Sequence, residues 1–123
     1  MLAIKRALMG AAVAGGLLLN GGLALAQVAS PAPAPVGEDS PYFVPMRNNV
    51  FEKLDLVVPV GATVTWFNYD VEPHDVIERT AILFETPLAK TGESLSLTFN
   101  VPGTYAYVCD LHGGMEAVIT VTE

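Results

Sequence analysis

The sequence predicts one all-β domain, an antiparallel β-sandwich with Greek-key connections. Several short segments alternate apolar and polar residues with a period of two, which is typical of strands with one buried face. Turn residues separate these segments at intervals of roughly 8 to 12 positions. No segment after residue 26 keeps a helical period, and a chain of 123 residues has room for a single domain.

Gly61 divides the first two predicted strands, residues 54–60 and 63–68. Before the glycine, one face carries only apolar side chains, those of Leu54, Leu56, Val58 and Val60. After the glycine, one face carries Val64, Trp66 and Asn68. The other face carries Thr63, Thr65 and Phe67. Successive side chains of a strand point to opposite faces, so each segment has one face for the core.

Three further strands are expected toward the C-terminus. Residues 94–99 show the clearest alternation. Residues 101–109 open with a Pro-Gly turn and continue as a strand, and the side chains that share one face there are Tyr105, Tyr107 and Cys109. Residues 117–121 form the last strand, and residues 80–89 are expected to be irregular or to form a short helix.

The N-terminus predicts export. Lys5 and Arg6 precede a run of small and apolar residues that ends in Ala24-Leu25-Ala26, a small-x-small cleavage pattern. We expect residues 1–26 to be a cleaved signal peptide, residues 27–41 to be a flexible Pro/Ala-rich segment, and residues 42–123 to be the folded domain. The alternative is an uncleaved membrane anchor, which the glycines within the run disfavour.

The mature chain would be strongly acidic. The sequence holds 13 acidic and 6 basic residues; without Lys5 and Arg6 four basic residues remain, which gives a net charge of −9 with histidine neutral. This charge disfavours nucleic acid and anionic membranes as partners. It suits a basic protein partner.

The single cysteine and both histidines form the candidate site. Cys109 ends a predicted strand, His112 follows in a loop with two glycines, and Met115 leads into the last strand. His74 follows Pro73 beyond the second predicted strand, and in a Greek-key sandwich it can lie at the same end. Each of these residues alone is more often structural, so the prediction rests on their joint occurrence.

The donor types favour copper over zinc. Thiolate and thioether are soft ligands and imidazole is borderline, and two His with one Cys and a weak Met is the ligand set of a blue copper site. Structural zinc sites use four strong Cys or His ligands, and methionine is a poor one. We therefore expect one copper ion, bound by His74, Cys109, His112 and Met115.

These features resemble the plastocyanin and amicyanin family of type 1 copper proteins, the cupredoxins. The resemblance covers about residues 43–123 and rests on the segments "GATVTWFNYDVEPHDV", "GESLSLTFNVPGTYAYVC" and "CDLHGGM". The spacing Cys109-x-x-His112-x-x-Met115 is that of amicyanin, whereas plastocyanin has two more residues before its methionine. The resemblance implies a cupredoxin fold with His74, Cys109 and His112 as equatorial ligands and Met115 as the axial one.

The resemblance also assigns roles to neighbours of the ligands. Asp75 stands where the family usually has an asparagine that braces the cysteine loop, and Asp110 follows the cysteine itself. Both aspartates and Tyr107 are expected to support the site.

An electron-transfer surface is expected around His112, the ligand through which electrons would enter and leave. It would include Leu111, Gly113 and Pro73. Gly113 and Gly114 stand where amicyanins often have bulky residues, so the apolar part of this surface would be smaller.

The expected function is that of a small soluble electron carrier, which shuttles single electrons by Cu(I)/Cu(II) cycling between a redox donor and acceptor. A basic partner such as a c-type cytochrome would suit it. We expect a periplasmic monomer that binds no nucleic acid and, once the signal is cleaved, no membrane. The alternative is a periplasmic protein for copper storage, delivery or resistance. An enzyme with a Cys109–His112 nucleophile pair is less favoured, because no third orienting group is evident, so no catalytic activity is expected.

Overall fold

The computed structural model describes residues 27–32 and 34–123, and it confirms the all-β fold. The predicted signal peptide, residues 1–26, lies outside the described residues. The strands are β2 (Ala29–Pro31), β3 (Phe43–Arg47), β4 (Val50–Phe51), β5 (Asp55–Pro59), β6 (Thr63–Asn68), β7 (Ile77–Glu78), β8 (Ser94–Phe99), β9 (Gly103–Val108) and β10 (Glu116–Thr122). In the part of the chain that the structure describes, no helix is long and apolar enough to cross a membrane.

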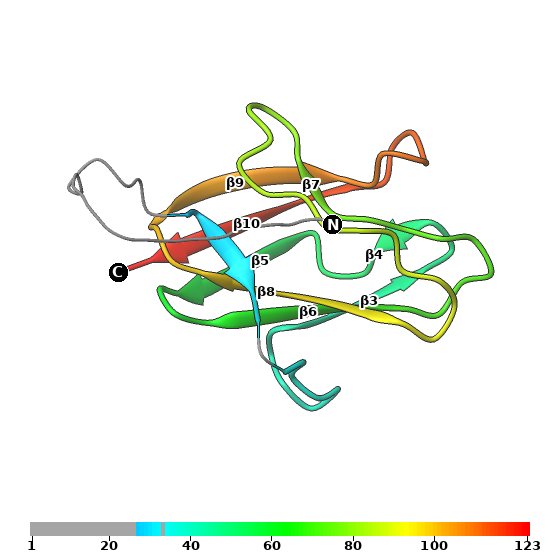
Figure 1. The fold of residues 1–123 in the computed structure, drawn as a ribbon, viewed down its shortest axis with the longest axis horizontal. Helices are drawn as coiled ribbons and strands as arrows, with labels where there is room; N and C mark the ends of the chain where they lie inside the picture. The colour runs from blue at the N-terminus through cyan, green and yellow to red at the C-terminus, as the bar shows by residue number, and fades with distance from the viewer. Residues whose placement is uncertain (1–26, 33) are drawn as a thin grey trace, which may run out of the picture.

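The strands form two sheets that pack face to face (Figure 1). One sheet has the order β5-β10-β9-β7, and the other has the order β2-β8-β6-β3-β4. The pairs β5–β10 and β3–β6 are parallel, and the other pairs are antiparallel. The predicted alternating segments all form strands, whereas β2, β3, β4 and β7 were not expected from the sequence pattern. Residues 80–89 are irregular, apart from two isolated bridges at Glu85 and Ala89.

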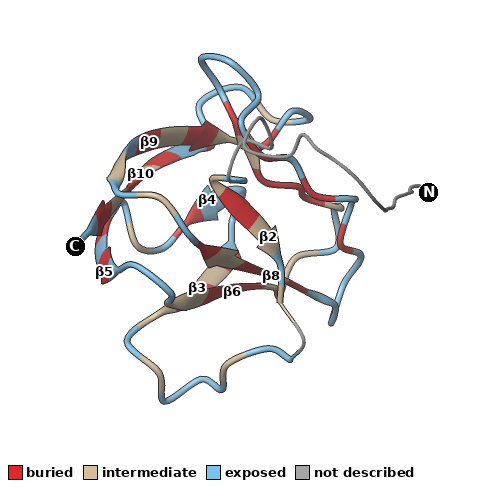
Figure 2. Cartoon of the chain, turned by 60° about the vertical axis from the view of Figure 1, so that its left-hand side comes forward, coloured by how far each residue is buried: buried red, intermediate tan, exposed pale blue. Residues whose placement is uncertain are grey.

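The core lies between the sheets, and its buried residues come from strands of both sheets (Figure 2). Leu95, Leu97 and Phe99 of β8 are all buried, as their alternation predicts. Trp66 of β6 is fully buried, and its indole N–H donates a 3.2 Å hydrogen bond across the core to the hydroxyl of Tyr107 on β9. This bond joins the two sheets directly.

The first predicted strand is shorter than its apolar pattern. Leu56 and Val58 are buried, but Leu54 is 60% exposed and Val60 is 42% exposed. The prediction that all four residues face the core is therefore wrong at both ends. Both residues lie just outside β5, which is an edge strand, although their backbones still form hydrogen bonds with β10.

The Pro/Ala-rich segment before residue 42 contributes to the five-stranded sheet, although its composition predicts flexibility. Its strand β2 pairs antiparallel with β8, which would otherwise have a free edge. Further along, the N–H of Val36 donates to Oγ1 of Thr65 at 2.8 Å, and Glu38 accepts a 2.9 Å hydrogen bond from the hydroxyl of Tyr69. Backbone pairing thus adds order that composition does not indicate, while the domain boundary at residue 42 stays a prediction.

Candidate metal centre

The connection between β9 and β10 carries three of the four predicted ligands. Cys109 directly follows β9, and Met115 directly precedes β10. Their backbones are joined, because the N–H of Cys109 donates to the carbonyl of Met115 at 3.0 Å. Inside the loop, the N–H of Met115 donates to the carbonyl of His112 at 3.2 Å, and Gly114 adopts a φ of +85° that favours glycine. The loop is therefore short and closed at its base.

The fourth predicted ligand, His74, comes from the loop after β6. Its backbone exchanges two hydrogen bonds with Ala89, of 3.1 and 2.7 Å. The buried amide of Asn68 holds the preceding turn: its Nδ2 donates to the carbonyls of Glu72 and Ala89 at 2.8 and 2.9 Å, and its Oδ1 accepts from the N–H of Asp70 at 2.7 Å. These bonds fix the backbone on both sides of His74.

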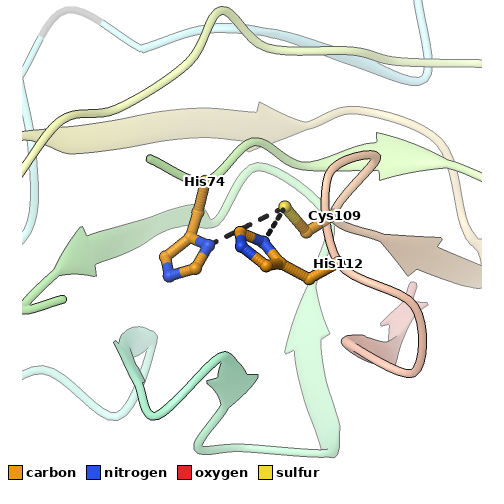
Figure 3. A group of neighbouring side chains, drawn as sticks. All are labelled: His74, Cys109 and His112. Atoms are coloured by element: carbon orange, nitrogen blue, oxygen red, sulfur yellow. Dashed lines mark hydrogen bonds between the residues drawn. The ribbon is translucent and has the colours of Figure 1, made fainter. Parts of the chain in front are cut away.

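The structure brings His74, Cys109 and His112 together at one end of the sandwich (Figure 3). One ligand atom from each residue lies within 4.8 Å of the others. Sγ of Cys109 is 3.8 Å from Nδ1 of His74 and 3.4 Å from Nδ1 of His112. His74 and Cys109 are buried, and His112 is half-buried. Met115 is 1% exposed, at the end of the same loop.

These residues fit a copper ion. Both imidazoles present the same nitrogen, Nδ1, toward the thiol sulfur, so three donors of suitable softness converge on one point. Burial raises the pKa of the Cys109 thiol; N–H groups of Asp75 and Leu111 offset part of this rise, and the Asp75 carboxylate adds to it. A thiol with a raised pKa carries its proton at neutral pH, so binding of a metal ion must release that proton.

The expected supporting residues lie close to the site. Asp75 is buried, and its Oδ1 accepts a 2.8 Å hydrogen bond from the backbone N–H of Asp110, which ties the His74 segment to the cysteine loop. The contact to Asp110 thus involves its backbone, and its side chain is exposed. Tyr107 is fully buried two residues before Cys109, and burial raises the pKa of its hydroxyl.

The expected electron-transfer surface is partly open to solvent. Leu111 is 51% exposed, Gly113 is exposed, and Pro73 and His112 are half-buried. A cavity of about 240 Å³ opens beside the ligand loop and is lined by Cys109, His112, Met115 and both glycines, together with Arg79 and neighbouring loop residues. The missing side chains at the two glycines leave this side of the loop uncovered.

Two supporting residues were not foreseen from the sequence. Asp70 contacts His74, with 2.8 Å between Oδ2 and Nε2, and Asn68 holds the turn between them. In the sequence, the feature that could have indicated this contact was the spacing of four residues between Asp70 and His74. It was weak, because an acidic residue in an exposed loop is ordinarily solvated. Burial raises the pKa of Asp70, but N–H groups of Asn49 and Asn48 and the His74 ring outweigh it, and the pKa is lowered overall.

Known proteins have sequences and structures similar to those of this chain. The sequence profile of the copper-binding proteins of the plastocyanin/azurin family matches residues 44–122. The chain is 35% identical to the amicyanin of Paracoccus denitrificans over 96 residues, which span 75% of this chain and 73% of that protein. It is 36% identical to the plastocyanin of Scenedesmus fuscus over 84 residues, which span 58% of this chain and 86% of that protein.

Solved structures of amicyanin also share the fold. A reduced mutant of amicyanin superimposes with a TM-score of 0.67 at 31% identity, over 76% of this chain and 98% of that one. A Cu(I) form of another amicyanin mutant gives a TM-score of 0.68 at 30% identity, with the same coverage. The converging thiol and imidazoles, the sandwich that holds them and the match over residues 44–122 lead to one conclusion: the chain belongs to the plastocyanin/azurin family of copper-binding proteins, and copper is its cofactor.

Proposed function

We propose that His74, Cys109, His112 and Met115 hold one type 1 copper ion, through which this chain carries single electrons between redox proteins. The observation that carries the proposal is the convergence of two Nδ1 atoms and Sγ within 4.8 Å of one another. When bound, copper supplies the one-electron Cu(I)/Cu(II) couple. The chain supplies ligands whose backbones are held by strands and hydrogen bonds.

Fixed ligand positions suit an electron carrier. The base of the cysteine loop is closed by a backbone hydrogen bond, and Asp75 ties it to the segment of His74. Because the ligands are held by strands and buried hydrogen bonds, they have little freedom to rearrange when the charge of the site changes. A small rearrangement is what fast electron exchange needs.

A thiol enzyme fits the site less well. A nucleophilic cysteine needs a lowered thiol pKa, and such residues lie in electropositive, partly exposed surroundings. Burial here raises the pKa of Cys109, and an acidic side chain, Asp75, lies beside it. The family relationship likewise indicates electron transfer in place of catalysis.

The partners would be a redox donor and a redox acceptor that dock transiently at the half-buried His112. The excess of acidic over basic residues favours a basic partner, for which a c-type cytochrome is one candidate. We further propose that the chain acts as a monomer in the periplasm, after cleavage of residues 1–26.

Visible absorption and EPR spectra of the purified protein with one equivalent of Cu(II) test the proposal. We expect an intense blue thiolate-to-copper band with a narrow parallel hyperfine splitting. The matched variant Cys109→Ser keeps the size of the side chain and removes the thiolate, so it should lose both features completely.

A pale spectrum that Cys109→Ser leaves unchanged would contradict the proposed site. Repeated reduction and reoxidation then separates the carrier from a copper-delivery protein. A carrier keeps its copper and its blue band through the cycles. Release of copper on each reduction would instead favour copper storage or delivery.

A further inference from the structure

The carboxylate of Asp70 connects its own loop, which also carries His74, to the turn between β3 and β4. Its Oδ1 accepts a 2.8 Å hydrogen bond from the N–H of Asn48, and its Oδ2 accepts a 3.0 Å hydrogen bond from the N–H of Asn49. The same Oδ2 lies 2.8 Å from Nε2 of His74. The Asp70 side chain is only 17% exposed, and the side chain of His74 is fully buried. This contact therefore faces little competition from water.

The two N–H donors come from the tight turn between β3 and β4. Asn48 and Asn49 have φ values of 56° and 59°, in the left-handed region that asparagine tolerates better than most residues. A two-residue turn with both φ values positive is the type that fits the twist of a β-hairpin. The turn belongs to the paired strands of the sheet, so it holds Asp70 on a rigid element.

This arrangement determines where the proton of His74 resides. A carboxylate that already accepts two N–H groups has only acceptor positions left for a third neighbour. Nε2 of His74 must therefore carry the hydrogen and donate it to Oδ2. In the neutral ring, Nδ1 is then left with a free lone pair, and Nδ1 is the atom that faces Sγ of Cys109 at 3.8 Å.

We propose that Asp70 is a positioning residue for the copper site, which fixes the ring and the tautomer of His74 through a clamp built by the Asn48–Asn49 turn. The proposal rests on the proposed function, since it assigns His74 as a ligand. It gives the β3–β4 hairpin a role in the metal centre, although the hairpin supplies no ligand. It also places a negative charge next to a ligand, which stabilises Cu(II) more than Cu(I).

The variant Asp70→Asn tests the role, because it keeps the shape of the side chain and removes its charge. Loss of such a partner of a metal-bound histidine typically lowers metal affinity by roughly 10- to 100-fold. We expect a loss of this size in Cu(II) affinity, measured by competition with a chelator, and a higher midpoint potential. Asp70→Glu, which restores the charge, should recover part of the affinity.

Glu72→Gln is the matched control. Glu72 lies on the same loop, is exposed and carries the same charge. If Asp70 acted only through the overall charge of the loop, both variants would change affinity and potential equally. We expect Glu72→Gln to stay within about twofold of the unmodified protein, a change that is small beside the effect of a lost partner of a metal-bound histidine.

The tautomer can be read without any variant and without copper. Nitrogen-15 NMR of the unmodified copper-free protein at neutral pH should show the proton of His74 on Nε2. A proton on Nδ1, or an Asp70→Asn affinity equal to that of Glu72→Gln, would overturn the proposal. If the proton of His74 lies on Nε2 but the protein with Cu(II) shows no blue band, the proposed function fails and the assigned tautomer does not. The two results are independent, because the tautomer is measured without copper.

Discussion

Replacing Trp66 with alanine is expected to lower the free energy of unfolding of the copper-free protein by about 3–5 kcal/mol. Trp66 is fully buried between the sheets, and its ring packs edge-on against Tyr107 and Phe99, with centroid distances of 5.6 and 6.4 Å. Its removal leaves a large cavity, and the Tyr107 hydroxyl loses its indole donor. Because domains of this size are stable by only about 5–15 kcal/mol, the loss is a large share of the total.

The comparison with Trp66→Phe separates the cavity from the hydrogen bond. Phenylalanine keeps one six-membered ring and removes the rest of the indole with its N–H, so it loses the same hydrogen bond but leaves a smaller cavity, and we expect a smaller cost than for alanine. Urea unfolding followed by far-UV circular dichroism suits both variants, since Trp66 is the only tryptophan of the chain and fluorescence would be lost. Equal midpoints for the alanine and phenylalanine variants would refute the cavity argument.

Acid should destabilise the protein through Glu78, a buried carboxylate in β7. It accepts hydrogen bonds from the N–H groups of Thr80, Ala81 and Leu83, at 3.1, 2.9 and 3.2 Å, and from the Thr80 hydroxyl. Burial raises its pKa, but these donors outweigh burial and lower the pKa from 4.5 to about 2. The bonds also hold the following loop, in which Ile82 adopts a φ of 54° that a β-branched residue rarely takes.

A pKa that is lower in the folded chain than in the unfolded chain means that ionised Glu78 stabilises the fold. This contribution is complete above the unfolded pKa of 4.5 and is lost as the pH falls toward about 2. The size of the pKa change corresponds to about 3 kcal/mol. We therefore expect the free energy of unfolding of the copper-free protein to fall by about this amount, from Glu78 alone, between about pH 5 and about pH 2.

The variant Glu78→Gln isolates this contribution. It should be less stable than the unmodified protein at neutral pH, because an amide cannot accept all four bonds, and its stability should change less between about pH 5 and about pH 2. Urea unfolding at several pH values measures both effects. Glu85→Gln removes an exposed carboxylate from the same region and serves as the control. An unchanged pH dependence in Glu78→Gln would show that other carboxylates govern acid unfolding.

The sequence by itself determined the alternating strands and the identity of the ligand candidates. Both follow from local properties: a period of two places apolar side chains on one face, and a thiol, imidazoles and a thioether favour copper wherever the fold gathers them. The strands β5, β6, β8, β9 and β10 were therefore predictable. So was the convergence of His74 with Cys109 and His112, which the structure confirms.

Only the tertiary structure decided the parts that depend on partners far away in the chain. Strands β3 and β7 lack a clear alternation and exist because β6 and β9 offer them backbone partners. Glu78 is buried because the loop that follows it folds back around its carboxylate.

Asp70 shows the same limit at the metal centre. In the sequence it is one of many loop acids, and it becomes a partner of His74 only because the Asn48–Asn49 turn, more than twenty residues earlier in the chain, donates two N–H groups to it. A hydrogen bond between distant segments leaves no period and no spacing in the sequence. The donor atoms of the site were thus encoded locally, whereas the contacts that orient them arise from the packing of the sandwich.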